Sequence, residues 1–482
     1  MLKKTFISAF VFFLIGMCST SSEVSLPSEF NNCVISLDSA LDQLKNLKDE
    51  SNLDFEYRIV REETTRDECI DMILGTNLEQ GSVLSNDSLI DLVVGVKKNE
   101  ITESVKKSEY ELYMEQINEL GVNSLNLLDA QLFGNAEISN FFEGVGVISH
   151  ISKSNSLGYE IVFSIAEGVI YGIKDGILDI LLDILLDISD VTIKESESGL
   201  HSFEFIEINS QTHLVITYSD IENNYYYFAS YEVINNEIDT NSRKNLAKFE
   251  TNGNKVHFGG KILKHKEKAI LCLGDLNSPG NSAKFDSPWG KVVSIDVESA
   301  YENTITSVDD KSVNVIAYGF RNPWSCFLND SSLIIPDVGN SHWEEVNLIS
   351  EFEQQNEVLF FGWPWLESFF DANYRNEPVT TEIKEQQLKD SIPPSFIFPH
   401  ANNYCAVIGG TNLDSSRKWG EYVFVGDFCT GTIWALNLDE NTKLKVLDRD
   451  IVPYSITTIQ DSGNESLLVG TTSGNIFEIL LP

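Results

Sequence analysis

The stretch that decides the fold lies near the middle of the chain. Tyr-Gly-Phe-Arg-Asn-Pro-Trp at residues 318–324 is followed by Pro-Asp-Val-Gly-Asn-Ser-His-Trp-Glu-Glu-Val-Asn at residues 336–347 and by Gly-Trp-Pro at residues 362–364. Short runs rich in β-branched and aromatic residues recur on both sides of these blocks, at residues 159–165, 213–218, 225–231, 268–273, 313–318, 422–425 and 466–470. Turn-forming clusters such as Asn-Gly-Asn at residues 252–254 separate the runs. Many short strands without long helices between them predict a β-propeller or a large barrel.

The region before these strands has a different texture. Residues 39–48 place apolar side chains at helical spacing, whereas residues 55–60 and 89–96 have the composition of strands. At 482 residues the chain is also too long for one ordinary core. We therefore expect a small α+β domain over residues 23–145, which could act as an accessory domain or bind a protein partner, and a β-rich domain over residues 146–482.

The first 22 residues are typical of a secretory signal peptide. Lys3 and Lys4 precede an apolar run at residues 6–17 that is too short to span a bilayer, and small residues follow. Cys18 could alternatively be a lipoprotein anchor, but Met17 stands before it where a small residue is expected. No later stretch is long and uncharged enough for a transmembrane segment. We expect a secreted or periplasmic protein.

The formal net charge is −39. An acidic surface of this kind repels phosphate backbones and anionic lipid headgroups, so the charge argues against nucleic-acid binding. A solvated surface that favours solubility is a sufficient explanation for it.

The three central blocks, in this order and spacing, resemble the soluble quinoprotein sugar dehydrogenases of the glucose/sorbosone dehydrogenase family. That family also includes the propeller domain of the Hedgehog-interacting proteins. Further matching stretches lie at residues 257–263, 289–296, 404–410 and 426–434. The resemblance implies an all-β fold, a six-bladed β-propeller over residues 146–482. It also implies a bound pyrroloquinoline quinone (PQQ), a calcium ion, and oxidation of an aldose or sorbosone by hydride transfer to the quinone.

Six cysteines remain beyond Cys18, and an even number in an exported chain permits three disulfides. Cys33 and Cys69 flank the first part of the amino-terminal region, so we pair them. Cys405 and Cys429 fall within blocks that resemble the family, and we pair these next. Cys272 and Cys326 are left by elimination, and either could instead be a free buried thiol.

The resemblance carries several cofactor residues over to this chain. Arg321 and Asn322 match an arginine–asparagine pair that binds the quinone oxygens, and a guanidinium can donate two parallel hydrogen bonds to such oxygens. His257 matches a histidine beside the cofactor. Gly339 and Asn340 match positions whose backbone carbonyls bind calcium. Arg321 could alternatively satisfy propeller carbonyls, without any cofactor.

The catalytic base is the difficulty that the resemblance raises. Ile206 stands where we place the catalytic histidine of the family pattern. Glu204 shares a strand face with Ile206 and is a candidate displaced base, although a salt-bridged or solvent-facing carboxylate is the commoner fate. His201, five residues before Ile206, is expected on the opposite strand face. Phe258 replaces an amide that would approach the quinone, and Thr430 lies where a basic residue is expected.

Two functions from different classes follow. The first is an active sugar dehydrogenase with a divergent pocket, in which Trp363 and Trp365 could stack on a sugar and His342 or His400 could replace the base. The second is an inactive propeller that binds a glycan or a protein partner. Retention of Arg321 favours the first, and the missing histidine favours the second.

Overall fold

The computed structural model describes residues 24–97, 131–132 and 136–482, apart from gaps at 29, 52–55, 65, 67–68, 70–71, 79–81, 86–87, 154–155, 175–180, 193, 401–402, 438–443 and 449–450. The predicted signal peptide lies outside the described residues. The chain divides into two compact units, residues 1–106 and residues 107–482. No helix in the described ranges is long and apolar enough to cross a membrane.

The first unit is the predicted small α+β domain. Its helix is α1 (Leu37–Ser51), and its sheet has the order β1–β3–β2, with β1 (Glu56–Thr64), β2 (Ile73–Thr76) and β3 (Leu89–Lys97). Ser36 Oγ accepts a hydrogen bond from the backbone N–H of Ser39 at 3.3 Å, as expected at a helix amino terminus. A buried apolar cluster that includes Phe30, Leu44 and Leu92 forms the core.

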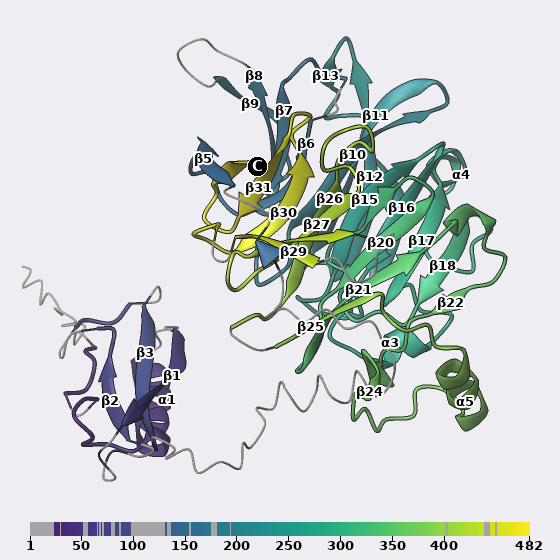
Figure 1. Ribbon diagram of the computed structural model, residues 1–482. Coiled ribbons are helices and arrows are strands. Elements are labelled where there is room, and N and C mark those ends of the chain that lie inside the picture. Colours follow the sequence, from purple (N-terminus) through teal and green to yellow (C-terminus); the bar gives the residue numbers. More distant parts are fainter. Residues whose placement is uncertain are drawn as a thin grey trace, which may run out of the picture. The chain divides into compact units, whose positions relative to one another are not determined.

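The second unit is a six-bladed propeller, as predicted (Figure 1). Each blade is a sheet built around consecutive antiparallel strands, and its first strand is named first in the lists that follow. Blade 1 has β6 (Ile148–Ser152), β7 (Ile161–Ile165), β8 (Val169–Lys174) and β9 (Leu181–Asp187). Blade 2 has β10 (Leu200–Ile208), β11 (Gln211–Asp220), β12 (Tyr225–Ile234), the short β13 (Glu237–Ile238) and β14 (Lys244–Glu250). Blade 3 has β15 (Gly259–His265), β16 (Lys268–Leu273), β17 (Lys291–Asp296), β18 (Val313–Tyr318) and β22 (Leu359–Phe360).

The remaining three blades follow in chain order. Blade 4 has β19 (Phe327–Asn329), β20 (Ser332–Asp337), β21 (Trp343–Ile349) and β25 (Phe396–Pro399). Blade 5 has β26 (Val407–Asn412), β27 (Tyr422–Asp427), β28 (Ile433–Asn437), β29 (Leu444–Asp448) and β4 (Gln131–Leu132). Blade 6 has β30 (Ile456–Asp461), β31 (Ser466–Thr471), β32 (Ile476–Leu480) and β5 (Glu137–Phe142). The connections between strands of blades 3 and 4 contain α3 (Gly280–Ala283), α4 (Val297–Glu302), η2 (Phe352–Gln354), the hairpin β23 (Leu366–Glu367)–β24 (Phe370–Asp371), and α5 (Thr381–Asp390).

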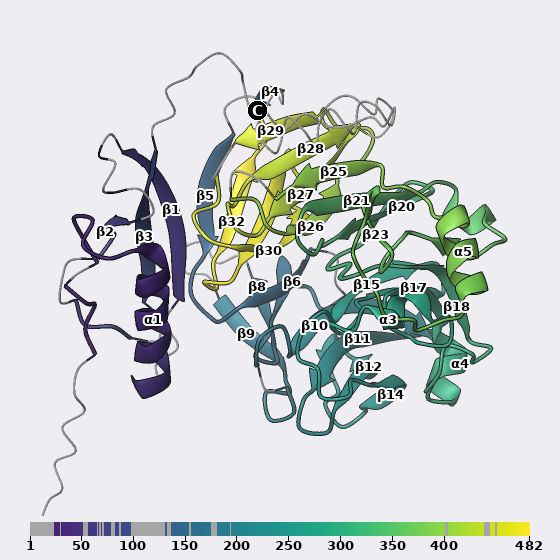
Figure 2. The same ribbon diagram turned by 90° about the horizontal axis from the view of Figure 1, so that it is seen from below.

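Strands from the two ends of the second unit close the ring. β5 pairs antiparallel with β32, with Ile138 opposite Ile479, and both views show the blue β5 beside the yellow carboxy-terminal strands (Figures 1 and 2). Closure in this way leaves fewer unpaired sheet edges. It also corrects the predicted domain start at residue 146, because β5 supplies the fourth strand of blade 6 from residues 137–142.

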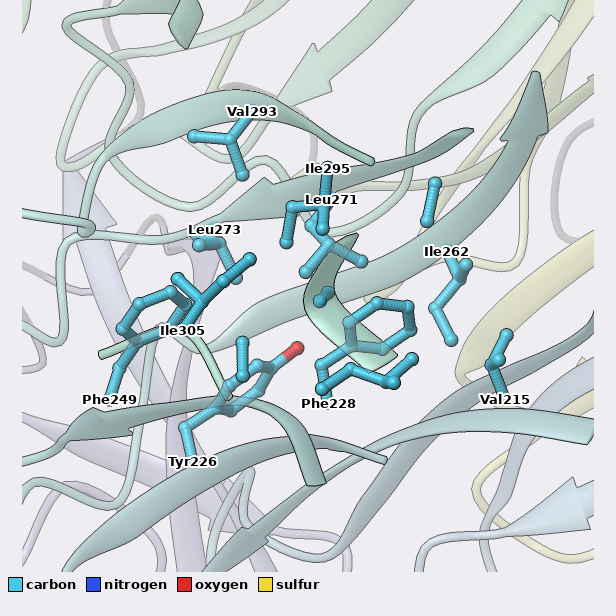
Figure 3. Close-up of a cluster of buried hydrophobic side chains, with 14 of the residues drawn as sticks. Val215, Tyr226, Phe228, Phe249, Ile262, Leu271, Leu273, Val293, Ile295 and Ile305 are labelled. Carbon is cyan, nitrogen blue, oxygen red and sulfur yellow. The ribbon is translucent and has the colours of Figure 1, made fainter. Parts of the chain in front are cut away.

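Apolar contacts between neighbouring blades form the core. Figure 3 shows the cluster between blades 2 and 3, where Val215, Tyr226 and Phe228 face Ile262 and Leu271. Burying one such side chain contributes roughly 1.5–3 kcal/mol. Six of the seven runs that predicted strands lie within observed strands, and the seventh, residues 159–165, overlaps β7 from residue 161 onward.

All three predicted disulfides are present, Cys33–Cys69, Cys272–Cys326 and Cys405–Cys429. The second joins β16 of blade 3 to the segment that leads into β19 of blade 4. The third lies within blade 5.

Candidate active site

The candidate site lies where the chain enters the first strands of blades 3 and 4. His257 precedes β15, and Asp275 follows β16, the strand paired with β15. Extending the register of Gly259 opposite Leu273 by two residues brings His257 opposite Asp275. The backbone N–H of Asp275 donates to the carbonyl of Arg321 at 2.7 Å, which joins this hairpin end to the loop before β19.

His257 and Asp275 form a buried pair. His257 Nδ1 lies 2.7 Å from Asp275 Oδ1. The same carboxylate accepts from the backbone N–H of Asn277 at 2.7 Å and from Trp363 Nε1 at 2.9 Å. Because these partners are donors, the carboxylate fixes the proton of His257 on Nδ1 and leaves Nε2 as the basic nitrogen. No hydrogen bond within the described part of the chain involves Nε2.

Blades 4 and 5 carry an aspartate close to the corresponding position, at the end of their second strand, but its partners differ from those of Asp275. Asp337 ends β20 and accepts from the backbone N–H groups of Arg321 at 2.9 Å and Asn322 at 2.7 Å. Asp427 ends β27 and accepts from the backbone N–H groups of Cys405 and Ala406 at 2.9 and 3.1 Å. Both carboxylates therefore cap the loop that enters the first strand of their blade. Asp275 instead binds a histidine side chain.

Arg321 and Asn322 lie beside this pair, on the loop that Asp337 caps. Burial raises the pKa of Asp337 to about 7, although the two backbone donors and the Arg321 charge oppose the shift. Arg321 Nη1 donates to the carbonyl of Val338 at 3.1 Å, and its guanidinium lies 5.9 Å from the ring centre of Trp363. Neither contact uses all of the guanidinium donors.

Asn322 has an unsatisfied oxygen. Its Nδ2 donates weakly to Glu197 Oε2 at 3.5 Å, whereas its Oδ1 is buried without a partner among the described residues. Glu197 Oε2 also accepts from the backbone N–H of His257 at 2.7 Å. A buried oxygen without a donor is uncommon in native structures and points to a ligand or an ordered water. The amide therefore has a free acceptor beside the histidine.

The carboxylates of Glu367 and Glu344 hold the predicted calcium loop in place by hydrogen bonds. Glu367 Oε1 accepts from four consecutive backbone N–H groups, those of residues 340–343, at 2.8 to 3.1 Å. Although burial raises the pKa of Glu367, these donors lower it below its ordinary value. Glu344 accepts from the backbone N–H of Gly339 at 3.2 Å and from His400 Nε2. The carbonyls of Gly339 and Asn340 accept no hydrogen bond from the described residues.

The structure does not support the roles considered for Ile206 and Glu204. Ile206 is fully buried in the core between blades 2 and 3, so it faces no site. Glu204 also lies on β10, where Oε1 accepts from the backbone N–H of Phe205 at 2.8 Å and burial raises its pKa. Neither residue contacts His257 or Arg321. That Ile206 replaces the catalytic histidine of the family stays a prediction.

The predicted direction of His201 is wrong. The β10–β11 register shifts between Leu200 and Ser202, so His201 sits at a bulge that interrupts the alternation of faces. Its ring lies 5.5 Å from that of Tyr226 and 5.1 Å from that of Phe258, on the same side as Ile206. Phe258 is buried in this cluster and does not reach the site.

Other aromatic and basic candidates are also engaged. Trp365 is buried and donates to Gln387 at 2.8 Å, so it offers no face to a sugar. Thr430 Oγ1 donates to Asp427 at 2.8 Å and stays a local cap. His400 is bound to Glu344, whereas His342 is half exposed.

Comparison with known proteins agrees with this architecture. The family model described as glucose/sorbosone dehydrogenase matches residues 170–476, more than half of the chain. The chain belongs to the glucose/sorbosone dehydrogenase family. Among curated proteins, none matches the sequence.

Solved structures of the same fold cover most of the chain. The apo aldose sugar dehydrogenase of Escherichia coli has a TM-score of 0.56 and 14% identity, over 72% of this chain and 100% of that one. The PQQ-bound aldose sugar dehydrogenase of Streptomyces coelicolor has a TM-score of 0.54 and 14% identity, over 72% and 98%. A Trichoderma reesei protein of carbohydrate-active enzyme family AA12 has a TM-score of 0.50 and 13% identity, over 74% and 99%.

Sequence reasoning missed three residues of this family member. Asp275, Glu197 and Glu367 were given no role, yet they hold the side chain of His257, its backbone and the 340–343 loop. For Asp275 a signal existed, since an acidic residue follows the strand that pairs with the one His257 precedes. For Glu197 and Glu367 there was none, because their partners lie on other blades or loops.

Proposed function

We propose that the protein is an exported PQQ-dependent sugar dehydrogenase that oxidises the hydroxyl of an aldose or a related sugar. The observation that carries the proposal is the His257–Asp275 pair, set beside Arg321 and Asn322. Removal of hydride from a carbinol carbon requires a base on its hydroxyl, and a histidine in a fixed tautomer is suited to that role.

Each residue then has a distinct task. His257 Nε2 takes the hydroxyl proton, and the Asp275 carboxylate holds the ring and stabilises the imidazolium that forms. The free Oδ1 of Asn322 accepts a hydrogen bond from a second hydroxyl of the sugar or from an ordered water. Arg321 provides positive charge where negative charge develops on a bound acceptor. PQQ, when bound, supplies the hydride acceptor.

Arg321 and Asn322 fit the oxygens along one side of the quinone. Arg321 and Asn322 would hold its oxygens, since a guanidinium recognises neighbouring oxygens in a bidentate manner. The described residues contain no group of three or more His, Cys, Asp or Glu that could hold a metal. Calcium would therefore depend on the main-chain oxygens of Gly339 and Asn340, which are hard ligands of the type it prefers.

Export is supported by three disulfides, which persist in oxidising compartments. The sequence of residues 1–22 has the features of a signal peptide. The acidic surface argues against a nucleic-acid partner.

The test uses the full chain after signal removal, with calcium, PQQ, a redox dye and a panel of aldoses. We expect binding at micromolar quinone, followed by bleaching of the quinone and dye reduction with at least one aldose. Failure to bind the quinone would remove the proposal.

The second candidate is a propeller that binds a glycan without oxidising it. It is favoured by Phe258 and Thr430, since the first is buried between blades and the second is bound to Asp427. Neither can supply the donor expected near a quinone. Quinone binding without turnover on any aldose would favour this candidate.

A further inference from the structure

A pocket of about 440 Å³ lies between the edge of blade 2 and the loop of blade 3 that follows Asp275. Its wall is formed by Tyr225, the end of β14, Asn281 and residues 287–289, and we call it the rim pocket. The loop that follows β14 leads to His257, so the rim pocket lies at the end of the blades that carries the candidate site. Its lining, drawn from the described residues, includes neither His257 nor Arg321, so the two sites are distinct.

The apolar part of this wall is fixed by contacts within the protein. Phe249 and Trp289 are 2% and 3% exposed, and their rings meet edge to face with centres 6.3 Å apart. Trp289 Nε1 donates to the backbone carbonyl of Glu250 at 3.1 Å, which joins blade 3 to the edge of blade 2. The buried ammonium of Lys291 donates to the backbone carbonyls of Lys284 and Trp289 at 2.7 and 3.2 Å. A wall held in this way binds a ligand without first having to become ordered.

The polar part of the wall has unused hydrogen-bonding groups. The Tyr225 hydroxyl, the Lys248 ammonium and the Asn252 amide form no hydrogen bond or ion pair with any described residue. Lys248 Nζ lies 3.5 Å from the centre of the Tyr225 ring, a contact that positions the ammonium but leaves its N–H groups free. Asn281 Nδ2 donates to the backbone carbonyl of Asp275 at 3.0 Å, and its Oδ1 accepts no hydrogen bond from the described part of the chain.

These groups suit a neutral ligand with many hydroxyls. A sugar ring carries hydroxyls that both donate and accept, and the free groups of the wall include donors and acceptors. Lys248 and Glu250 supply one charge of each sign, so the wall does not select for a charged ligand. A few polar groups beside aromatic side chains, in a volume within the roughly 300–1,000 Å³ of small-molecule sites, are typical of ligand pockets.

We propose that the rim pocket binds one sugar residue of a glycan, at a site separate from that of the proposed oxidation. Tyr225, Lys248 and Asn252 bind the hydroxyls, and Phe249 and Trp289 face the C–H groups. The inference goes beyond the proposed function and does not depend on it, because a glycan can be held here whether or not His257 acts as a base.

Binding is measured by titration calorimetry on the full chain after signal removal, without quinone. The probes are the methyl glycosides of maltotriose and cellotriose, which have no free anomeric hydroxyl and cannot be oxidised there. Lys248→Met removes the ammonium, and Asn252→Gly removes the amide at a residue with φ of +51°, which glycine adopts without strain. Lys244→Met is the matched control, because Lys244 lies at the other end of β14 and its ammonium is 3.9 Å from the centre of the Tyr301 ring.

We expect at least one of the two glycosides to bind. Lys248→Met and Asn252→Gly should each weaken this binding at least fivefold and keep the melting temperature of the wild type, with the affinity of Lys244→Met unchanged. The proposal is overturned if neither glycoside binds, if both pocket variants bind as the wild type does, or if Lys244→Met weakens binding as much as Lys248→Met.

The same proteins, assayed with calcium, PQQ and a panel of aldoses, separate this inference from the proposed function. Glycoside binding that depends on Lys248 and Asn252, without oxidation of any aldose, would remove the proposed function and leave the rim pocket as a glycan site. Aldose oxidation without glycoside binding would remove the glycan site and leave the proposed function.

Discussion

Replacing Asp275 by Asn tests the histidine pair most sharply. The buried carboxylate accepts from His257, Asn277 and Trp363 at 2.7, 2.7 and 2.9 Å. An amide at this position has one oxygen, so its NH₂ group must face at least one of these donors. If the NH₂ group faces His257, it donates to Nδ1 and moves the ring proton to Nε2. The ring can then no longer accept a proton at Nε2.

The size of the effect follows from the role of a positioned base, which is worth about 10²–10⁴-fold in rate. We therefore expect kcat of Asp275→Asn to fall by about 10²–10⁴-fold, or roughly 3–5 kcal/mol of barrier. Stability should fall by about 1.5–3 kcal/mol, the value of one hydrogen bond to a charged group. Quinone affinity should be unchanged, because no quinone contact is assigned to Asp275.

The assay is dye-linked aldose oxidation with saturating calcium and PQQ, alongside urea unfolding. Asp427→Asn is the matched control, since Asp427 is equally buried but accepts from backbone N–H groups and from Thr430. The control should lose stability and keep its kcat within about threefold. If Asp275→Asn also kept its kcat within threefold, the proposed role of the pair would be refuted.

Four further predictions follow. Ile206→His should lower the free energy of unfolding by about 1–3 kcal/mol, because it buries a polar group; urea unfolding measures this loss. The variant should gain no activity, and a gain in kcat would contradict the site described above. Glu367→Gln should weaken calcium binding about 10–100-fold, as for other residues that orient metal ligands, as measured by titration with Ca²⁺; an unchanged affinity would show that Glu367 does not shape the loop. Removing the Cys272–Cys326 disulfide by double alanine substitution should cost about 4 kcal/mol in unfolding free energy for a separation of 54 residues; a loss below 1 kcal/mol would contradict the chain-entropy estimate. Burial lowers the pKa of Lys261 to about 8, so above pH 8 the folded state binds fewer protons than the unfolded state. The free energy of unfolding, measured relative to that of Lys261→Met, should therefore rise from pH 8 to 10 by about 1.4 kcal/mol per pH unit. A difference that does not change with pH would refute the shift.

The propeller could be predicted because its strands carry their signal locally. Strands buried on both faces need continuous runs of β-branched and aromatic residues, as at Lys268–Leu273 of β16. The first unit was predictable for the same reason. The closing strand β5 was not, since its partner β32 lies more than 300 residues later in the chain.

The spacing of the acidic residues in β9 is ambiguous as a sequence pattern. Asp183 and Asp187 are four residues apart, a spacing that places them on one face of a helix and equally on one face of a strand. The structure has the strand β9, in which Asp183 accepts from Tyr159 and Lys174 at 2.8 and 3.1 Å. Pairing with β8 makes this segment a strand, and the local sequence pattern carries no information about that pairing.

The candidate site was predictable only in part. Arg321 and Asn322 were found from a contiguous motif, and they lie together beside His257. The partner of His257 could not be found that way, because hairpin register brings Asp275 to it across 18 residues. The bulge at His201 also defeats the rule of alternating faces on which the sequence argument depended.

The central claim is that His257 is the base. The most direct measurement is the anaerobic rate at which an aldose bleaches bound PQQ in stopped flow, in wild type and in His257→Gln. We predict equal quinone affinity and a rate at least about 10²-fold lower in the variant. An equal rate in the two proteins would contradict the account.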